Sequence, residues 1–132
     1  LDFGCGPGPA LAHMLRDAGH RVSCYDPFFA PDTAVLETSY DFITATEVVE
    51  HLHEPASTFE LLDALMRPGA LLGVMTEFLT DDSRFAGWYY RNDISHVVFY
   101  TARTLKRLAE RMGWEIEIPR KNVAIFSKPA QP

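Results

Sequence analysis

The sequence predicts an α/β fold in which a doubly wound, mostly parallel sheet ends in an antiparallel hairpin. Three observations lead to this prediction. Short β-branched and apolar runs alternate with segments whose apolar residues recur every three or four positions, as expected for strands and amphipathic helices. A glycine-rich turn joins the first strand to the first helix. The last two strands are joined by a turn too short for a crossover helix, so they are expected to run antiparallel.

The expected elements are a strand that ends at residue 3, a helix over 9–19, strands over 21–25 and 41–46, a helix over 54–66, a strand over 70–78, a helix over 101–113, and strands over 114–118 and 123–127. Each helix carries one apolar face, which in the first helix consists of Leu11, Met14, Leu15 and Ala18. Gly19 and Gly113 stand at the positions of helix C-caps, and Thr101 stands at an N-cap. The nearly continuous apolar run at 70–78 indicates a strand buried on both faces.

Two connections are irregular. Residues 30–39 have a mixed, proline-containing sequence, and we expect a loop with one helical turn there. Residues 79–100 form the least regular stretch of the chain. Its aromatic side chains Trp88, Tyr89 and Tyr90 either line a pocket or cover the edge of the core.

Length and composition fit one globular domain. The 132 residues are 47% hydrophobic and 23% charged, which predicts a single domain over 1–132; because the chain opens inside a strand, we expect N-terminal elements to be missing. The net charge of −6 argues against a broad nucleic-acid-binding face. No apolar run is long enough to span a membrane. Without a zinc-site or signal-peptide pattern, Cys5 and Cys24 are expected to be thiols in a reduced, cytoplasmic protein.

The glycine-rich turn is the most informative segment. Gly4, Gly6 and Gly8 at alternate positions let the backbone turn sharply and approach a ligand, toward which the next helix points its N-terminal amides. Asp26, at the end of the second strand, is placed to accept hydrogen bonds from ribose hydroxyls. A dinucleotide site requires a third glycine where this chain has Pro9, which disfavours a nicotinamide-dependent oxidoreductase. The alternative is a turn that only connects strand to helix.

This G-x-G-x-G turn, with Asp2 two residues before the first glycine, resembles motif I of the class I S-adenosylmethionine-dependent methyltransferases, which have a Rossmann-like fold. The resemblance implies that the turn holds the methionine part of the cofactor and that Asp26 holds the ribose. The cofactor-binding residues implied are then Asp2, Gly4, Cys5, Gly6, Gly8 and Asp26. Similarity to the ubiquinone-type, methyltransferase-23-like branch continues through 40–52, 65–72 and 96–114, and so covers nearly the whole chain.

One departure from the family concerns the adenine region. Only fourteen residues separate Asp26 from Asp41, where the family places a helix, a third strand and a loop that contacts adenine. We therefore expect the third strand and the adenine loop to be shortened. Phe28, directly after Asp26-Pro27, either supplies an aromatic wall for the base or packs in the core.

Two hypotheses concern the chemistry. His96 lies where the family closes over the methyl acceptor, and a neutral imidazole near pH 7 suits a general base for a hydroxyl or amine. Alternatively, Glu47, Glu50, His51 and His96 together bind a divalent metal, for which carboxylates and imidazoles are suitable ligands. The resemblance adds that an ExxEH string completed by a later histidine binds metal in methyltransferases of ubiquinone and of small-RNA 2′-hydroxyls. The other possibility is that Glu50 and His51 pack a loop while Glu47 touches the cofactor.

The function that we expect is methyl transfer from S-adenosylmethionine to a small-molecule acceptor at oxygen or nitrogen. The protein has only to align the acceptor with the sulfonium methyl group, exclude water and, for some acceptors, remove a proton. The alternative from another class is a domain that binds the cofactor without catalysis, as a scaffold or regulatory subunit. The acceptor itself and the oligomeric state are left open.

Overall fold

The structure is a computed structural model that describes residues 1–130. Six strands form one sheet in the order β2-β1-β3-β4-β6-β5. Their bounds are β1 Asp2–Phe3, β2 Cys24–Tyr25, β3 Tyr40–Thr46, β4 Met66–Met75, β5 Glu115–Arg120 and β6 Val123–Ser127. The first four in this order are parallel, and β6 runs antiparallel to both β4 and β5. The predicted fold class is therefore confirmed.

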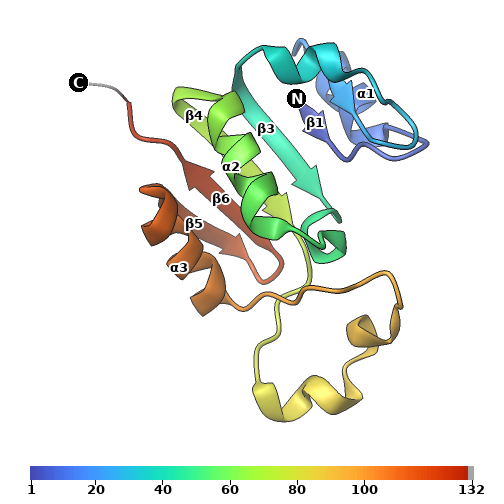
Figure 1. Ribbon diagram of the computed structural model, residues 1–132, viewed down its shortest axis with the longest axis vertical. Coiled ribbons are helices and arrows are strands. Elements are labelled where there is room, and N and C mark those ends of the chain that lie inside the picture. The colour runs from blue at the N-terminus through green and yellow to red at the C-terminus, as the bar shows by residue number, and fades with distance from the viewer. Residues whose placement is uncertain (131–132) are drawn as a thin grey trace.

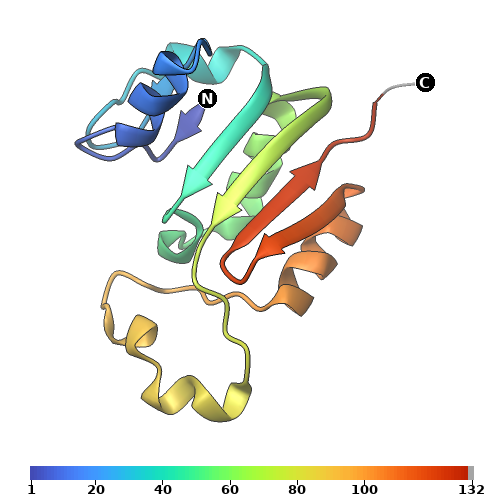
Figure 2. The same cartoon turned by 180° about the vertical axis from the view of Figure 1, so that it is seen from behind.

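Helices cover the two faces of the sheet unequally. On one face lie α2 (Pro55–Leu65) and α3 (Ala102–Met112), and on the other α1 (Ala10–Asp17) covers only the β1 end (Figures 1 and 2). The main core lies between the sheet and the α2–α3 layer. Its largest fully buried hydrophobic side chains include Phe59, Leu62, Leu72, Leu105 and Phe126.

The helix ends follow the expected capping chemistry. Pro55 occupies the first turn of α2, where its missing N–H costs nothing. The Thr101 hydroxyl accepts a hydrogen bond from the Thr104 amide, and α3 ends at Gly113 in a left-handed conformation. The expected apolar face of α1 is covered only in part. Leu11 and Leu15 are half-buried, but Met14 is 68% exposed, and the one buried residue of α1 is Ala12, which lies outside the expected face.

The strand β4 departs from the sequence prediction at both ends. It begins at Met66 directly after α2, and it ends at Met75 rather than at residue 78. Pro68 and Gly69 lie within the strand, where its pairing register with β3 shifts between Met66 and Leu71. Gly69 accommodates this irregularity with a φ of 79°.

The region between β2 and β3 is as short as predicted. It contains a single 3₁₀ helix, Thr33–Glu37, whose first turn is capped by the Asp32 carboxylate, and β2 forms an edge of the sheet. Within residues 1–130, no helix has the length and apolar character required to span a membrane.

Residues 79–100, here called the lid segment, extend beyond the carboxyl ends of β3 and β4 (Figure 1). They contain two short 3₁₀ helices, Asp82–Gly87 and Tyr89–Asn92. The segment leaves and re-enters the domain at one point, because the Leu79 amide donates to the Tyr100 carbonyl at 2.8 Å. The lid segment thus extends from the carboxyl ends of the strands, where the glycine-rich turn also lies.

Candidate functional site

The glycine-rich turn is tightly packed at Gly4 and open at Gly6 and Gly8. Gly4 has a φ of 74°, its amide donates to the Tyr25 carbonyl at 2.7 Å, and a Cβ atom at Gly4 would lie 2.3 Å from Cγ2 of Val48. Gly6 has a φ of 67°, yet a Cβ atom there, or at Gly8, would meet nothing within 4 Å. The turn therefore needs glycine at position 4 for packing, whereas positions 6 and 8 border open space.

Asp26 connects this turn to the loop after β2. Asp26 is only 7% exposed, and its Oδ2 accepts a hydrogen bond from the Gly6 amide at 3.0 Å. Oδ1 accepts from the amides of Phe28 and Phe29, at 2.9 and 3.1 Å. Because a carboxylate oxygen can accept two bonds, Oδ2 keeps one position for a ligand hydroxyl. The sequence pointed to ribose binding at Asp26 but gave no sign of this structural role.

Phe28 and Phe29 form an exposed aromatic pair beside Asp26. They are 83% and 59% exposed, and their ring centroids lie 6.5 Å apart in an edge-to-face arrangement. Core packing, one of the two possibilities for Phe28, is therefore wrong. The exposed rings are suitable for covering an aromatic base.

Two of the expected cofactor residues lie below or within the turn. Asp2 is 4% exposed, and its Oδ1 accepts a hydrogen bond from the Thr44 hydroxyl at 2.8 Å, which links β1 to β3. Cys5 is half-buried, with Sγ 3.6 Å from the Gly6 carbonyl oxygen. Burial, followed by the nearby Cys24, raises the pKa of the Cys5 thiol to about 11, so it is protonated at neutral pH.

The loop after β3 lies against the turn. Glu47 has a φ of 53°, a left-handed conformation that is uncommon for glutamate, and its amide donates to the Met75 carbonyl at 2.9 Å. This sharp bend directs Val48 toward Gly4 and begins the 3₁₀ helix Val49–His51. Glu47 and the glycine-rich turn thus belong to one edge of the sheet.

A buried carboxylate follows Glu47 by one helical turn. Glu50 is fully buried, its Oε1 accepts a hydrogen bond from the Tyr90 hydroxyl at 2.5 Å, and its Oε2 has no partner among the described residues. The same hydroxyl lies 3.0 Å from Oε2 of Glu47. Partial burial raises the pKa of Glu47 to about 7, with further contributions from its hydrogen bond to Glu50 and from the charges of Glu50 and Glu77.

Two histidines complete the cluster, and their hydrogen bonds define their tautomers. Nδ1 of His51 lies 3.0 Å from the Ser95 carbonyl oxygen, and Nδ1 of His96 lies 2.7 Å from the Tyr90 carbonyl oxygen. Because a carbonyl can only accept, each Nδ1 carries the proton, and each neutral ring has its lone pair on Nε2. The ring centroids lie 4.8 Å apart. His51 comes from the β3 loop and His96 from the lid segment, so the chain fold brings them together.

Three of the four predicted metal ligands come together in this cluster. Ligand atoms of Glu50, His51 and His96 lie within 4.8 Å of one another. Glu47 is not part of this set in the described region, because its carboxyl group is directed to the Tyr90 hydroxyl. The set contains a carboxylate oxygen without a partner and two imidazoles whose other nitrogen is held by a backbone carbonyl, which is the arrangement that metal-ligating histidines adopt.

The aromatic residues of the lid segment divide into two groups. Phe85, Trp88 and Phe99 pack against one another with centroid distances of 5.4–6.5 Å, so they form a small core for the lid segment itself. Tyr89 is 67% exposed, whereas Tyr90 is 6% exposed and reaches back to the sheet edge. The sequence grouped Tyr90 with its neighbours, and only its contacts distinguish it.

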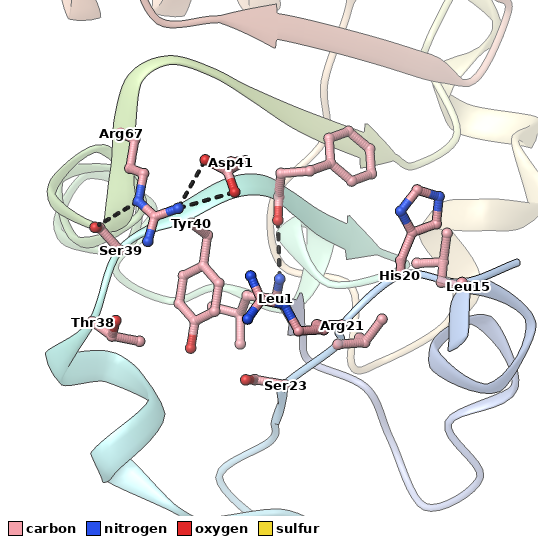
Figure 3. A pocket seen from close by; sticks show the side chains of 13 residues that line it. Leu1, Leu15, His20, Arg21, Ser23, Thr38, Ser39, Tyr40, Asp41 and Arg67 are labelled. Carbon is pink, nitrogen blue, oxygen red and sulfur yellow. Dashed lines mark hydrogen bonds and ion pairs between the residues drawn. The ribbon is translucent and has the colours of Figure 1, made fainter. Parts of the chain in front are cut away.

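An open cavity of about 890 Å³ lies at the opposite edge of the sheet (Figure 3). It is bordered by Leu1 at the start of β1, by the end of α1 and by the start of β3, where Arg67 forms a bidentate ion pair with Asp41 at 2.9 and 3.0 Å. None of the predicted site residues borders it. In parallel α/β sheets ligands bind at the carboxyl ends of the strands, so we place the candidate site at the glycine-rich turn and not in this cavity.

Comparison with solved structures identifies proteins of similar fold. The fold is similar to an O-methyltransferase family protein from Burkholderia thailandensis, with a TM-score of 0.70 and 15% identity over 99% of this chain and 51% of that chain. It is also similar to the 1,6-didemethyltoxoflavin N1-methyltransferase of the same organism, whose structure contains S-adenosylhomocysteine (TM-score 0.67, 18% identity, 97% and 69% coverage). A third structure, magnesium protoporphyrin IX methyltransferase from Synechocystis with bound S-adenosylhomocysteine, has a TM-score of 0.65 and 12% identity over 96% and 72% of the two chains.

These likenesses show the fold, and the chain spans about half the length of the first of these proteins. No curated protein matches the sequence significantly. A sequence profile described as a methyltransferase domain, however, matches residues 1–117, which include the glycine-rich turn, Asp26 and the whole Glu50–His96 cluster. The chain has the fold of the S-adenosylmethionine-dependent methyltransferases and belongs to the methyltransferase domain family.

Proposed function

We propose that this domain transfers a methyl group from S-adenosylmethionine to a small molecule at oxygen or nitrogen. The observation that carries the proposal is that two features lie together at the carboxyl ends of the strands. One is the open glycine-rich turn, which is hydrogen-bonded to Asp26, and the other is the histidine cluster, whose lone pairs are on Nε2. Methyltransferases of similar fold are named for 1,6-didemethyltoxoflavin and magnesium protoporphyrin IX, which supports a small-molecule acceptor.

The cofactor fits the turn on three grounds. Gly6 and Gly8 border free space, Oδ2 of Asp26 retains one acceptor position for a ribose hydroxyl, and the exposed ring of Phe28 offers an apolar surface for adenine. Asp2 links β1 to β3 directly before the turn, Cys5 lies within the turn, and Glu47 precedes Val48, whose side chain lies against Gly4. When bound, S-adenosylmethionine supplies an electrophilic methyl group with its own leaving group, so alignment of the acceptor is the main task of the protein.

His96 is our candidate for the base that removes the acceptor proton. Its Nδ1–H donates to the Tyr90 carbonyl, which directs the basic lone pair to Nε2. The side chain is 9% exposed, and its Nε2 lies 3.7 Å from Oδ2 of Asp93, which stabilises the imidazolium after proton transfer. A hydroxyl acceptor must lose its proton to give a neutral ether, and a protonated amine must lose one to free the lone pair that attacks the methyl group.

Cofactor titration tests this proposal first. Calorimetry should give micromolar binding of S-adenosylhomocysteine and no measurable binding of NAD, because Pro9 replaces the glycine that a dinucleotide turn requires. Tighter binding of NAD would overturn the assignment. Binding of S-adenosylhomocysteine without methyl transfer to any of a panel of hydroxyl and amine acceptors would favour the alternative, a non-catalytic cofactor-binding scaffold.

A second candidate is metal-assisted transfer, with Glu50, His51 and His96 as ligands. It is favoured by the unpartnered Oε2 of the fully buried Glu50 and by the two histidine tautomers. A divalent metal there would act as a Lewis acid toward an acceptor hydroxyl. Turnover should then stop in EDTA and return with Mg²⁺, Mn²⁺ or Zn²⁺, and calorimetry should detect Zn²⁺ binding that Glu50→Gln abolishes. Activity that is indifferent to EDTA would leave Glu50 and His51 with a packing role.

A further inference from the structure

Tyr90 is the side chain through which the lid segment reaches the sheet edge. Although it stands in an aromatic run with Trp88 and Tyr89, it is 6% exposed, whereas Tyr89 is 67% exposed. It belongs to the short 3₁₀ helix Tyr89–Asn92, which has no long-range strand pairing to hold it. Its position therefore depends on the contacts of its own hydroxyl, ring and carbonyl.

The hydroxyl of Tyr90 contacts three polar groups from two strand ends. It lies 2.5 Å from Oε1 of Glu50, 3.0 Å from Oε2 of Glu47 and 3.1 Å from Oγ1 of Thr76. A phenol has one proton to donate, and the shortest contact assigns it to Glu50. This bond satisfies Oε1 of a fully buried carboxylate and so determines which of its oxygens, Oε2, is left for another partner.

The carbonyl and ring of Tyr90 act on His96. The carbonyl oxygen accepts from Nδ1 of His96 at 2.7 Å, and the two ring centroids lie 4.1 Å apart. The lid segment returns to the same point, because the amides of Val97 and Val98 both donate to the Glu50 carbonyl, at 2.9 and 3.1 Å. Glu50 therefore receives the lid segment on both sides of His96, through Tyr90 before it and through Val97 and Val98 after it.

We propose that Tyr90 is a positioning residue of the acceptor site. Its hydroxyl anchors the 3₁₀ helix to Glu50, and its carbonyl, held in place by that anchor, fixes the His96 imidazole in the tautomer that has its lone pair on Nε2. This arrangement is the same whether His96 acts as a base or as a metal ligand. The consequence for methyl transfer rests on the proposed function, but the arrangement itself does not.

The test is the tautomer of His96 in the ligand-free chain, read from long-range ¹H–¹⁵N spectra of the imidazoles at about pH 8. The wild-type chain should give the Nδ1–H pattern for His96. Tyr90→Phe keeps the ring against His96 and removes only the hydroxyl, so it should convert this signal to an averaged or Nε2–H pattern. Tyr89→Phe removes an exposed neighbouring hydroxyl and should leave the spectrum unchanged.

Glu50→Gln separates the hydroxyl from the buried charge. The Tyr90 hydroxyl can still donate to the amide oxygen of Gln, so this variant should retain the wild-type His96 pattern. If Tyr90→Phe alone fails to fold because Glu50 loses its partner, Glu50→Gln with Tyr90→Phe removes that buried charge and should fold with the averaged pattern. An Nδ1–H pattern for His96 in folded Tyr90→Phe, or in the folded double variant, would overturn the proposal.

Transfer assays give the functional readout once an acceptor is found. Tyr90→Phe should lower kcat at least about 10-fold with the Kd for S-adenosylhomocysteine changed by less than about 2-fold, since the glycine-rich turn is untouched. Unchanged kcat together with an altered His96 tautomer would overturn the functional consequence. Absence of cofactor binding in the wild-type chain would instead contradict the proposed function and leave the tautomer result valid.

Discussion

The glycine-rich turn after β1 and the loop after β3 lie side by side at one edge of the sheet, but they are held in different ways. The turn is fixed by its own backbone and by Asp26, a residue twenty positions after Gly6, through amide–carboxylate bonds. The loop after β3 is fixed by side chains and carbonyls of the lid segment, about forty positions away, which reach Glu47, Glu50 and His51. The first arrangement depends on local conformation and the second on long-range packing.

This difference predicts two kinds of sensitivity. Substitutions in the turn should change folding and cofactor affinity, because the same amides and glycines serve both. Substitutions in the histidine cluster should change catalysis with little effect on cofactor binding, because the cluster does not support the turn. The four predictions below test this separation.

The largest effect is expected for His96→Ala. Removal of a positioned general base should lower kcat about 10²–10⁴-fold, with cofactor affinity almost unchanged. The wild-type rate should rise with pH, because only the neutral imidazole accepts a proton. His53→Ala changes an exposed histidine of the loop after β3, outside the cluster, and is the control. If His96→Ala kept the wild-type kcat and pH profile, His96 would not be the base, and alignment of the acceptor alone would account for the reaction.

The next effect should distinguish Gly4→Ala from Gly6→Ala. Both require a left-handed alanine, at a cost of roughly 1–2 kcal/mol. Only Gly4→Ala also forces a methyl group to 2.3 Å from Cγ2 of Val48, a stiff β-branched side chain, for which overpacking adds about 1–3 kcal/mol. Urea unfolding should therefore show the greater loss for Gly4→Ala. Gly6→Ala should instead weaken S-adenosylhomocysteine binding, because its methyl group enters the open space above the turn. Equal losses of stability would contradict this division of roles.

Asp26→Asn should cost about 1.5–3 kcal/mol of cofactor affinity, the usual range for hydrogen bonds to a charged group. The amide nitrogen cannot accept from the Gly6 or Phe28 amide, so a lower urea midpoint should accompany the weaker binding. Asp32→Asn changes another acidic residue of this loop, which caps the 3₁₀ helix, and should leave affinity unchanged. Equal affinities of Asp26→Asn and the wild type would remove Asp26 from the ribose.

The smallest effect concerns the pH dependence of stability. The pKa of Glu47 is raised from 4.5 to about 7 in the folded chain, so between these values the native state holds a proton that the unfolded chain has released. The free energy of unfolding should therefore fall as pH rises through this window. Glu47→Gln should remove this pH dependence, which amounts to less than about 1 kcal/mol of unfolding free energy over the whole window, because the carboxyl group is partly in water. A slope that is unchanged in urea titrations from pH 4 to 8 would contradict the raised pKa.

The sequence predicted the fold where local signals are strong. Glycine spacing, the Thr101 cap and the alternation of strands with helices all depend on neighbours within a few positions, and these predictions agree with the structure. It was wrong about the start of β4, which lies at Met66 and not at residue 70, because the tertiary pairing of β4 with β3 carries the strand across Pro68 and Gly69. The exposure of Met14 is a similar case, since an apolar face is buried only where another element covers it.

The sequence by itself determined the membership of the domain in its family and predicted a cofactor end at the glycine-rich turn, because the glycine spacing that encodes this turn lies in adjacent residues. It also singled out Glu50, His51 and His96, but it left open whether His96 is a general base or all three bind a metal, and it gave no distances between them. Only the tertiary structure decided that Asp26 is partly structural, that Phe28 is exposed and that Tyr90 links the histidine cluster to a buried carboxylate. Such contacts join segments about forty residues apart, and their distances follow from the packing of strands and lid rather than from any local pattern.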